Sequence, residues 1–106
     1  MDIGGCDVVV QTKFDLSQTL IEAIKAIESV WGTSVVEIDN PSEMFVYRSK
    51  AAAEAWDEEG WNEIRYAKDM VYLISCTLGQ LTFVIENTED ETLLRIIDAI
   101  TNALKP

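Results

Sequence analysis

Apolar residues that recur at three- and four-residue spacing constrain the fold of this chain more than any other feature. The first such stripe predicts a helix that begins after Asp15, an N-cap with Gln18 in the capping-box position, and stops at Gly32. A second stripe predicts a helix that runs to the C-terminus from a capping box formed by Thr88 and Glu91. The two stripes consist of Leu16, Leu20, Ile24, Ile27 and Trp31, and of Leu93, Ile96, Ile97, Ile100 and Leu104. Because each helix is apolar on one face only, both helices must pack against another layer.

The segments between these helices are short, rich in β-branched and aromatic residues, and bounded by turn residues. We expect strands at residues 6–14, 33–39, 44–47, 70–78 and 81–86, with hairpin turns at 40–42 and 79–80. The alanine-rich run 50–59, after Ser49 as N-cap, predicts a short helix that ends at Gly60. Residues 61–68 fit either a strand or an ordered loop.

The pattern of apolar residues also suggests which side of each strand faces the helices. In the first strand the even-numbered residues, including Val8 and Val10, are expected to point inward. The strand at 70–78 is apolar on both sides, and we assign Met70, Tyr72 and Ile74 to the inward side. An apolar sheet face opposite the helices would then remain, and the short helix or a second copy of the chain would have to cover it. That face is expected to contain Val9, Val71, Leu73 and Val84.

These elements together predict an α+β fold. With 106 residues the chain can bury about two-thirds of its unfolded surface, which suffices for one core, so we expect a single domain over residues 1–106. The expected architecture is a sandwich with a mixed, mainly antiparallel sheet of about five strands. Two long amphipathic helices lie on one face of that sheet, and one short helix is added.

The charge balance excludes several classes of partner. The chain has 8 Lys and Arg residues against 19 Asp and Glu residues, which gives a net charge of -11. Binding to nucleic acid or to an anionic membrane surface depends on Lys and Arg, so we expect neither partner. The N-terminus resembles no secretory signal, and no apolar run approaches the roughly 20 residues that cross a bilayer, so a cytoplasmic protein is expected.

The residue types available for catalysis are equally restrictive. The chain has no histidine and only two cysteines, Cys6 and Cys76, far apart in sequence. It therefore cannot supply a Ser-His-Asp site, a Cys-His site or a histidine-bound metal, and it contains no phosphate-binding glycine motif. We expect a protein that is not an enzyme, with no catalytic residues, no metal site and no cofactor.

The densest candidate for function is the acidic, tryptophan-containing segment from Glu54 to Glu63. Tryptophan beside charge is typical of interface anchors, although Trp56 is expected to pack against the sheet and the acids could simply form a solvated face. The expected partner-binding residues are Asp57, Glu58, Glu59, Trp61 and Glu63. The sequence thus predicts a small acidic cytoplasmic protein-interaction module, immunity-like or inhibitor-like, that binds a basic partner protein.

Two alternatives remain open at the level of sequence. The chain could be a homo-oligomeric structural or regulatory subunit that forms a homodimer through the apolar sheet face. It could instead be a small-ligand binding protein, with a pocket built from carboxylates, Arg65 and Tyr66.

Overall fold

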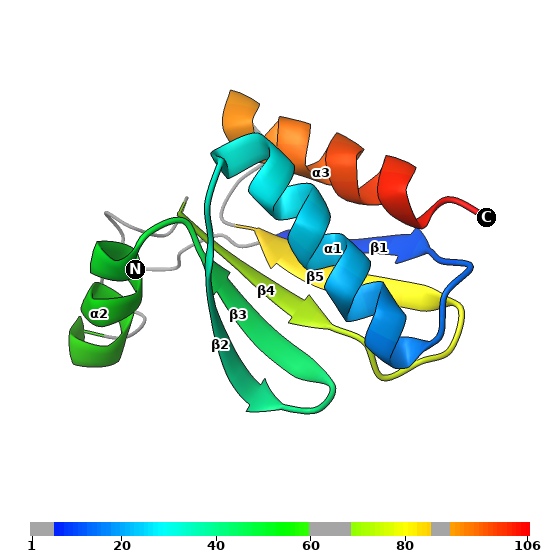
Figure 1. Cartoon of the computed structure of the whole chain (residues 1–106), viewed down its shortest axis with the longest axis horizontal. Coiled ribbons are helices and arrows are strands. Elements are labelled where there is room, and N and C mark those ends of the chain that lie inside the picture. The colour runs from blue at the N-terminus through cyan, green and yellow to red at the C-terminus, as the bar shows by residue number, and fades with distance from the viewer. Residues whose placement is uncertain (1–5, 60–68, 86–89) are drawn as a thin grey trace.

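The computed structural model describes residues 6–59, 69–85 and 90–106, and for residue 6 and residues 56–59 only the backbone is described. These ranges form five strands and three helices (Figure 1). In chain order they are β1 (Cys6–Gln11), α1 (Leu16–Trp31), β2 (Val35–Asn40), β3 (Glu43–Tyr47), α2 (Lys50–Glu59), β4 (Met70–Ile74), β5 (Gln80–Ile85) and α3 (Glu91–Leu104).

The five strands make one antiparallel sheet in the order β1-β5-β4-β3-β2, so β1 and β2 are its edges. The predicted hairpin turns join β2 to β3 and β4 to β5. Asn40 starts the first turn, because its side-chain oxygen accepts a hydrogen bond from the Ser42 backbone N–H at 2.9 Å. Gly79, with a φ of 89°, supplies the left-handed backbone of the second turn. The predicted α+β class is confirmed.

Side-chain caps fix where the long helices begin. Asp15 caps α1 as predicted, since its Oδ1 accepts a hydrogen bond from the Gln18 backbone N–H at 2.7 Å. The α3 helix is capped by Asp90, whose Oδ1 accepts from the Leu93 N–H at 3.1 Å, and not by the predicted Thr88, which lies outside the described residues. The N-cap is the residue directly before the first helical residue. Because α3 begins at Glu91, its N-cap is Asp90.

Both long helices pack on the same face of the sheet and against each other (Figure 1). Between them and the sheet lies the main core, which contains buried residues from every strand except β2. Its fully buried members include Ile27, Val46, Phe83, Ile96 and Ile100.

The assignment of strand faces is wrong for β4. Val71 and Leu73 are both 0% exposed and belong to the core beneath the helices, whereas Tyr72 lies on the opposite face. Val71 is paired with Val46 and Leu73 with Phe83, so the neighbouring strands decide which side of β4 is buried. The apolar side chains on both sides of β4 left this choice undetermined in the sequence.

Candidate interaction surface

The predicted partner-binding segment lies at the end of α2 and beyond it. Residues 57–59, which are Asp57, Glu58 and Glu59, form the last turn of α2, but only their backbone is described. Trp61 and Glu63 fall in the range 60–68, outside the described residues, and so do Arg65 and Tyr66 of the alternative ligand pocket. The structure therefore does not bring these side chains together or separate them, and both sites stay predictions.

The start of α2 is described in more detail and lies against the sheet. The Ser49 side chain caps it, accepting a hydrogen bond from the Ala52 N–H at 3.2 Å. Ala52 and Ala53 are buried in a small second cluster around Tyr47, on the sheet face opposite the long helices. The acidic end of α2 thus belongs to a helix that is anchored on this second face.

We call this second face, which the long helices leave uncovered, the open face. One row of side chains crosses it from edge to edge, because successive strand pairs bring residues of all five strands into register. From β1 to β2 the row consists of Asp7, Val84, Tyr72, Phe45 and Glu37. An apolar and aromatic centre therefore lies between two acids.

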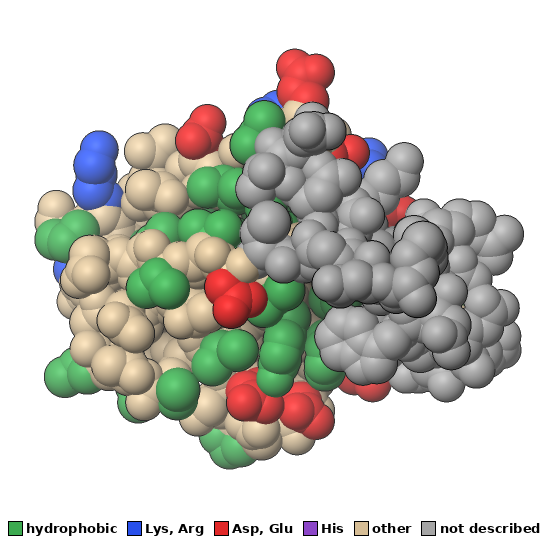
Figure 2. Space-filling view, turned by 180° about the vertical axis from the view of Figure 1, so that it is seen from behind, with side chains coloured by type: hydrophobic (Ala, Val, Ile, Leu, Met, Phe, Trp, Pro, Cys, Tyr) green, Lys and Arg blue, Asp and Glu red, His purple; other side chains and the backbone are tan. Residues whose placement is uncertain are grey.

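The centre of the row is an aromatic stack. The rings of Phe45 and Tyr72 lie 4.5 Å apart between centroids at an interplanar angle of 10°, and Tyr47 stacks on Phe45 at 6.3 Å. Phe45, Tyr72 and Val84 are each only partly buried. Figure 2 shows hydrophobic side chains gathered on this face, with acidic side chains among them.

A carboxylate fixes the Tyr72 hydroxyl at the edge of the stack. Burial, together with the hydrogen bond that Tyr72 donates to Glu43, raises the pKa of Tyr72 to about 12. The same hydrogen bond is the main reason that the pKa of Glu43 is lowered, and the Asn40 amide adds a second hydrogen bond at 3.0 Å. At neutral pH the tyrosine is therefore protonated and the carboxylate is ionised. Such a pair orients a ring and is poorly matched to proton transfer near pH 7.

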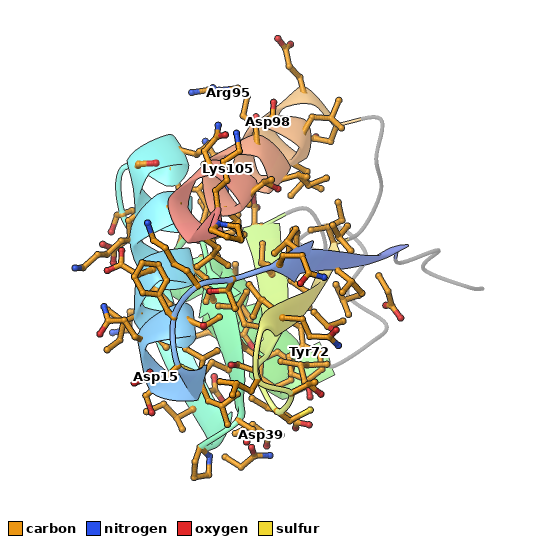
Figure 3. All side chains as sticks on the ribbon, turned by 90° about the vertical axis from the view of Figure 1, so that its right-hand side faces the viewer. Asp15, Asp39, Tyr72, Arg95, Asp98 and Lys105 are labelled. Atoms are coloured by element: carbon orange, nitrogen blue, oxygen red, sulfur yellow. The ribbon has the colours of Figure 1, made fainter. Side chains whose placement is uncertain are left out.

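The charges on the sheet have one sign. The five strands contain the acids Asp7, Glu37, Asp39 and Glu43 and no lysine or arginine. Figure 3 shows Asp39 and Tyr72 at the same end of the molecule, with Arg95, Asp98 and Lys105 of the α3 region at the opposite end. Arg48 directly follows the last residue of β3, and its guanidinium forms an ion pair with Asp69, with 3.7 Å between the Arg48 Nη1 and Asp69 Oδ1 atoms. The open face is therefore an apolar surface with an acidic rim.

Sequence reasoning missed this surface, although the alternation in β2 and β3 contained its signal. Residues at every second position give Glu37 and Asp39 in one strand and Glu43, Phe45 and Tyr47 in the other. Each set shares a face, and the two sets become neighbours once the hairpin forms. Only the partner strand β4, with Tyr72, was needed to complete the stack.

Metal and membrane sites find no support in the described part of the chain. There, His, Cys, Asp and Glu side chains form no group of three or more that could hold a metal ion. Nor is any helix within those ranges long and apolar enough to cross a membrane. No protein-family model matches the chain, and no curated protein or solved structure matches it either. The functional argument therefore starts from the open face itself.

Proposed function

We propose that this chain is a small acidic interaction module, immunity-like or inhibitor-like, that binds a basic partner protein in the cytoplasm through its open face. The observation that carries the proposal is the row across the sheet, in which Tyr72 and Phe45 lie between Asp7 and Glu37. Protein interfaces commonly have an aromatic centre that excludes water and a polar rim that remains hydrated.

The acids of the rim determine what kind of partner fits. A surface with charges of one sign accelerates encounter with an oppositely charged protein and disfavours partners of the same sign. The strands themselves contain no lysine or arginine, so a partner rich in these residues would complement the rim. The predicted acidic segment at residues 57–63 would add to the same field from the end of α2.

A second copy of the chain is a poorer occupant of this face. Two open faces packed together would place two acidic rims in one interface, within a dimer of twice the net charge of -11. Light scattering at micromolar concentration should therefore give a monomeric mass. A dimer that persists at low salt, and that Phe45→Ser dissociates, would favour the homodimer instead.

Matched charge reversals test the proposal. Glu37→Lys with Asp39→Lys alters exposed residues of β2, whereas the control, Glu28→Lys with Asp98→Lys, alters exposed residues of α1 and α3. Each double variant replaces two negative charges by two positive charges, which changes the net charge from -11 to -7. Differences between the two variants then report the position of the charge and not its total.

The immobilised wild-type chain and both variants would be exposed to native lysate, and the bound proteins identified and titrated. We expect the wild type and the control to retain the same basic protein, with an affinity that falls as salt increases. The β2 variant should bind it about tenfold or more weakly, because reversed charges face the partner's bases. Equal loss in both variants, or binding that is insensitive to salt, would refute the proposal. A third variant, Glu58→Lys with Glu59→Lys, tests the predicted segment in the same assay.

A further inference from the structure

The exposed edge strand β2 indicates how a partner engages the open face. Resting on the function proposed above, we infer that the basic partner contributes an extended strand that pairs with the outer edge of β2 and enlarges the sheet. The addition of a strand to a sheet edge is a recurring mode of recognition, in which backbone hydrogen bonds supply affinity and alternate side chains supply specificity.

On the helix side, an apolar surface extends past the helices and reaches β2. A second row of paired residues crosses that side of the sheet and runs through Val8, Phe83, Leu73, Met44 and Ile38. Phe83 and Leu73 are 0% exposed beneath the helices, but Ile38, at the end of the row, is 67% exposed. Val36 on the same side is 38% exposed, although its partner Val46 is fully buried. The helix layer thus ends one strand short of the sheet edge (Figure 1).

On the open-face side, the same strand presents acids. Glu37 and Asp39 alternate with Val36 and Ile38, and all four residues are exposed. A strand added beside β2 would place its own residues alternately next to the apolar pair and next to the acidic pair. The complementary strand therefore alternates apolar residues with Lys or Arg.

A second copy of β2 does not meet this requirement. If two β2 strands pair antiparallel about Glu37, then Glu37 lies opposite its own copy, and if they pair about Ile38, then Glu37 lies opposite Asp39. Like charges directly opposite each other destabilise a strand pair. The acids thus protect the edge against self-association, as charged edge strands commonly do, while a basic strand remains compatible.

The other edge of the sheet lacks this combination. On β1 the helix-side residue Val10 is buried, and α3 packs against the strand. Among the described β1 side chains, residues 7–11, the exposed ones are Asp7, Val9 and Gln11, all on the open face, while Val8 and Val10 on the helix side pack in the core. An added strand would therefore gain contacts with exposed side chains on only one of its faces at β1, whereas at β2 it would gain apolar contacts on the helix side and charge contacts on the open-face side.

Synthetic peptides provide the test, with the ¹⁵N-labelled full chain as receptor and amide hydrogen exchange as the readout. The probe is a short peptide that alternates lysine and valine. One control has the same composition with the lysines and valines in separate blocks. A second control keeps the alternating sequence but is N-methylated at every residue, which removes the backbone N–H donors from both edges of the strand and retains the charge.

We expect the alternating peptide alone to slow exchange of the outward-facing β2 amides, in the range 35–39, by about tenfold or more at saturation. Ile38→Lys should weaken its binding, and the matched variant Leu94→Lys, at an exposed apolar residue of α3, should not. Peptide binding that perturbs Tyr72 and Phe45 but leaves the β2 amides exchanging at their original rates would overturn strand addition and leave the proposed function standing. Equal protection by the N-methylated peptide would also overturn it. If no basic peptide binds and the wild type retains no basic protein from lysate, both proposals fail.

Discussion

Two valines on opposite faces of the sheet test the arrangement that creates the open face. Val71 on β4 is 0% exposed in the core beneath the helices, whereas Val9 on β1 is 55% exposed on the open face. The same substitution, valine to alanine, can be made at both positions, so the chemical change is identical and only the environment differs. The sequence pattern had placed both residues on one face.

The expected costs follow from burial. Val71→Ala removes two buried methyl groups at about 0.8 kcal/mol each and leaves a cavity, so the free energy of unfolding should fall by about 2 kcal/mol. That loss corresponds to a decrease in Tm of roughly 8 °C or more for a domain of this size. Val9→Ala removes methyl groups that are largely hydrated, and its cost should stay below about 0.5 kcal/mol.

Urea unfolding followed by circular dichroism measures both values, and an unchanged m-value in the two variants would show that each remains two-state. Equal losses at the two positions, or a larger loss for Val9→Ala, would refute the assignment of faces. The open face, with Tyr72 and Phe45 at its centre, would then not exist.

Three further predictions concern single contacts. Gly32→Ala should lower the free energy of unfolding by about 1 kcal/mol, because Gly32 ends α1 with a φ of 85°, which L side chains rarely adopt. An added Cβ would meet no atom within 4 Å, so the cost comes from the backbone alone. Denaturant unfolding measures the loss, and an unchanged midpoint would contradict the prediction. Ser75→Ala should lower the free energy of unfolding by about 1 kcal/mol in the same assay, because the buried Ser75 hydroxyl donates a hydrogen bond of 2.9 Å to the Leu16 carbonyl. An unchanged free energy of unfolding would show that this hydrogen bond does not stabilise the fold. Ultraviolet titration should show a tyrosine that ionises only near pH 12, and Tyr72→Phe should remove that step. Because the folded pKa is raised from 10.0, the stabilisation by protonated Tyr72 is complete below pH 10 and disappears as pH rises through about 12. A titration that the Tyr72→Phe substitution leaves unchanged near pH 12 would contradict the contact with Glu43.

The helices were predictable because their signals are local. The stripe that ends at Trp31, the cap at Asp15 and the stop at Gly32 all lie within one segment, and the structure confirms each of them. The short helix α2 likewise has the predicted bounds, Lys50–Glu59, because an alanine-rich run between a serine cap and a glycine is favourable without help from the rest of the chain.

Strand faces were less predictable because they depend on partners distant in sequence. Alternation identified the buried side of β1, where Val8 and Val10 contrast with Asp7 and Gln11. In β4 no such contrast exists, and the choice between Val71 and Tyr72 is made by pairing with β3 and β5.

The candidate surface was missed for the same reason. Tyr72 and Phe45 stack at 4.5 Å although they belong to strands far apart in sequence, and neither residue is conspicuous in its own segment. The sequence pointed instead to the acidic, tryptophan-containing segment from Asp57 to Glu63 as the binding site. That site remains a prediction, because the side chains of this segment lie outside the described residues. Composition predicted an acidic protein, but the place where acids border an exposed apolar surface depends on strand order.

Chemical-shift mapping of the ¹⁵N-labelled chain with the captured basic protein tests the proposed binding surface most directly. We predict that the largest shift changes occur on the open face, at Tyr72 and Phe45 and along β2 at Glu37 and Asp39, and that the outer surface of α3 around Arg95 and Asp98 stays unchanged. Shift changes centred on α3, with Tyr72 and Phe45 unaffected, would contradict the assignment of the open face as the interaction surface.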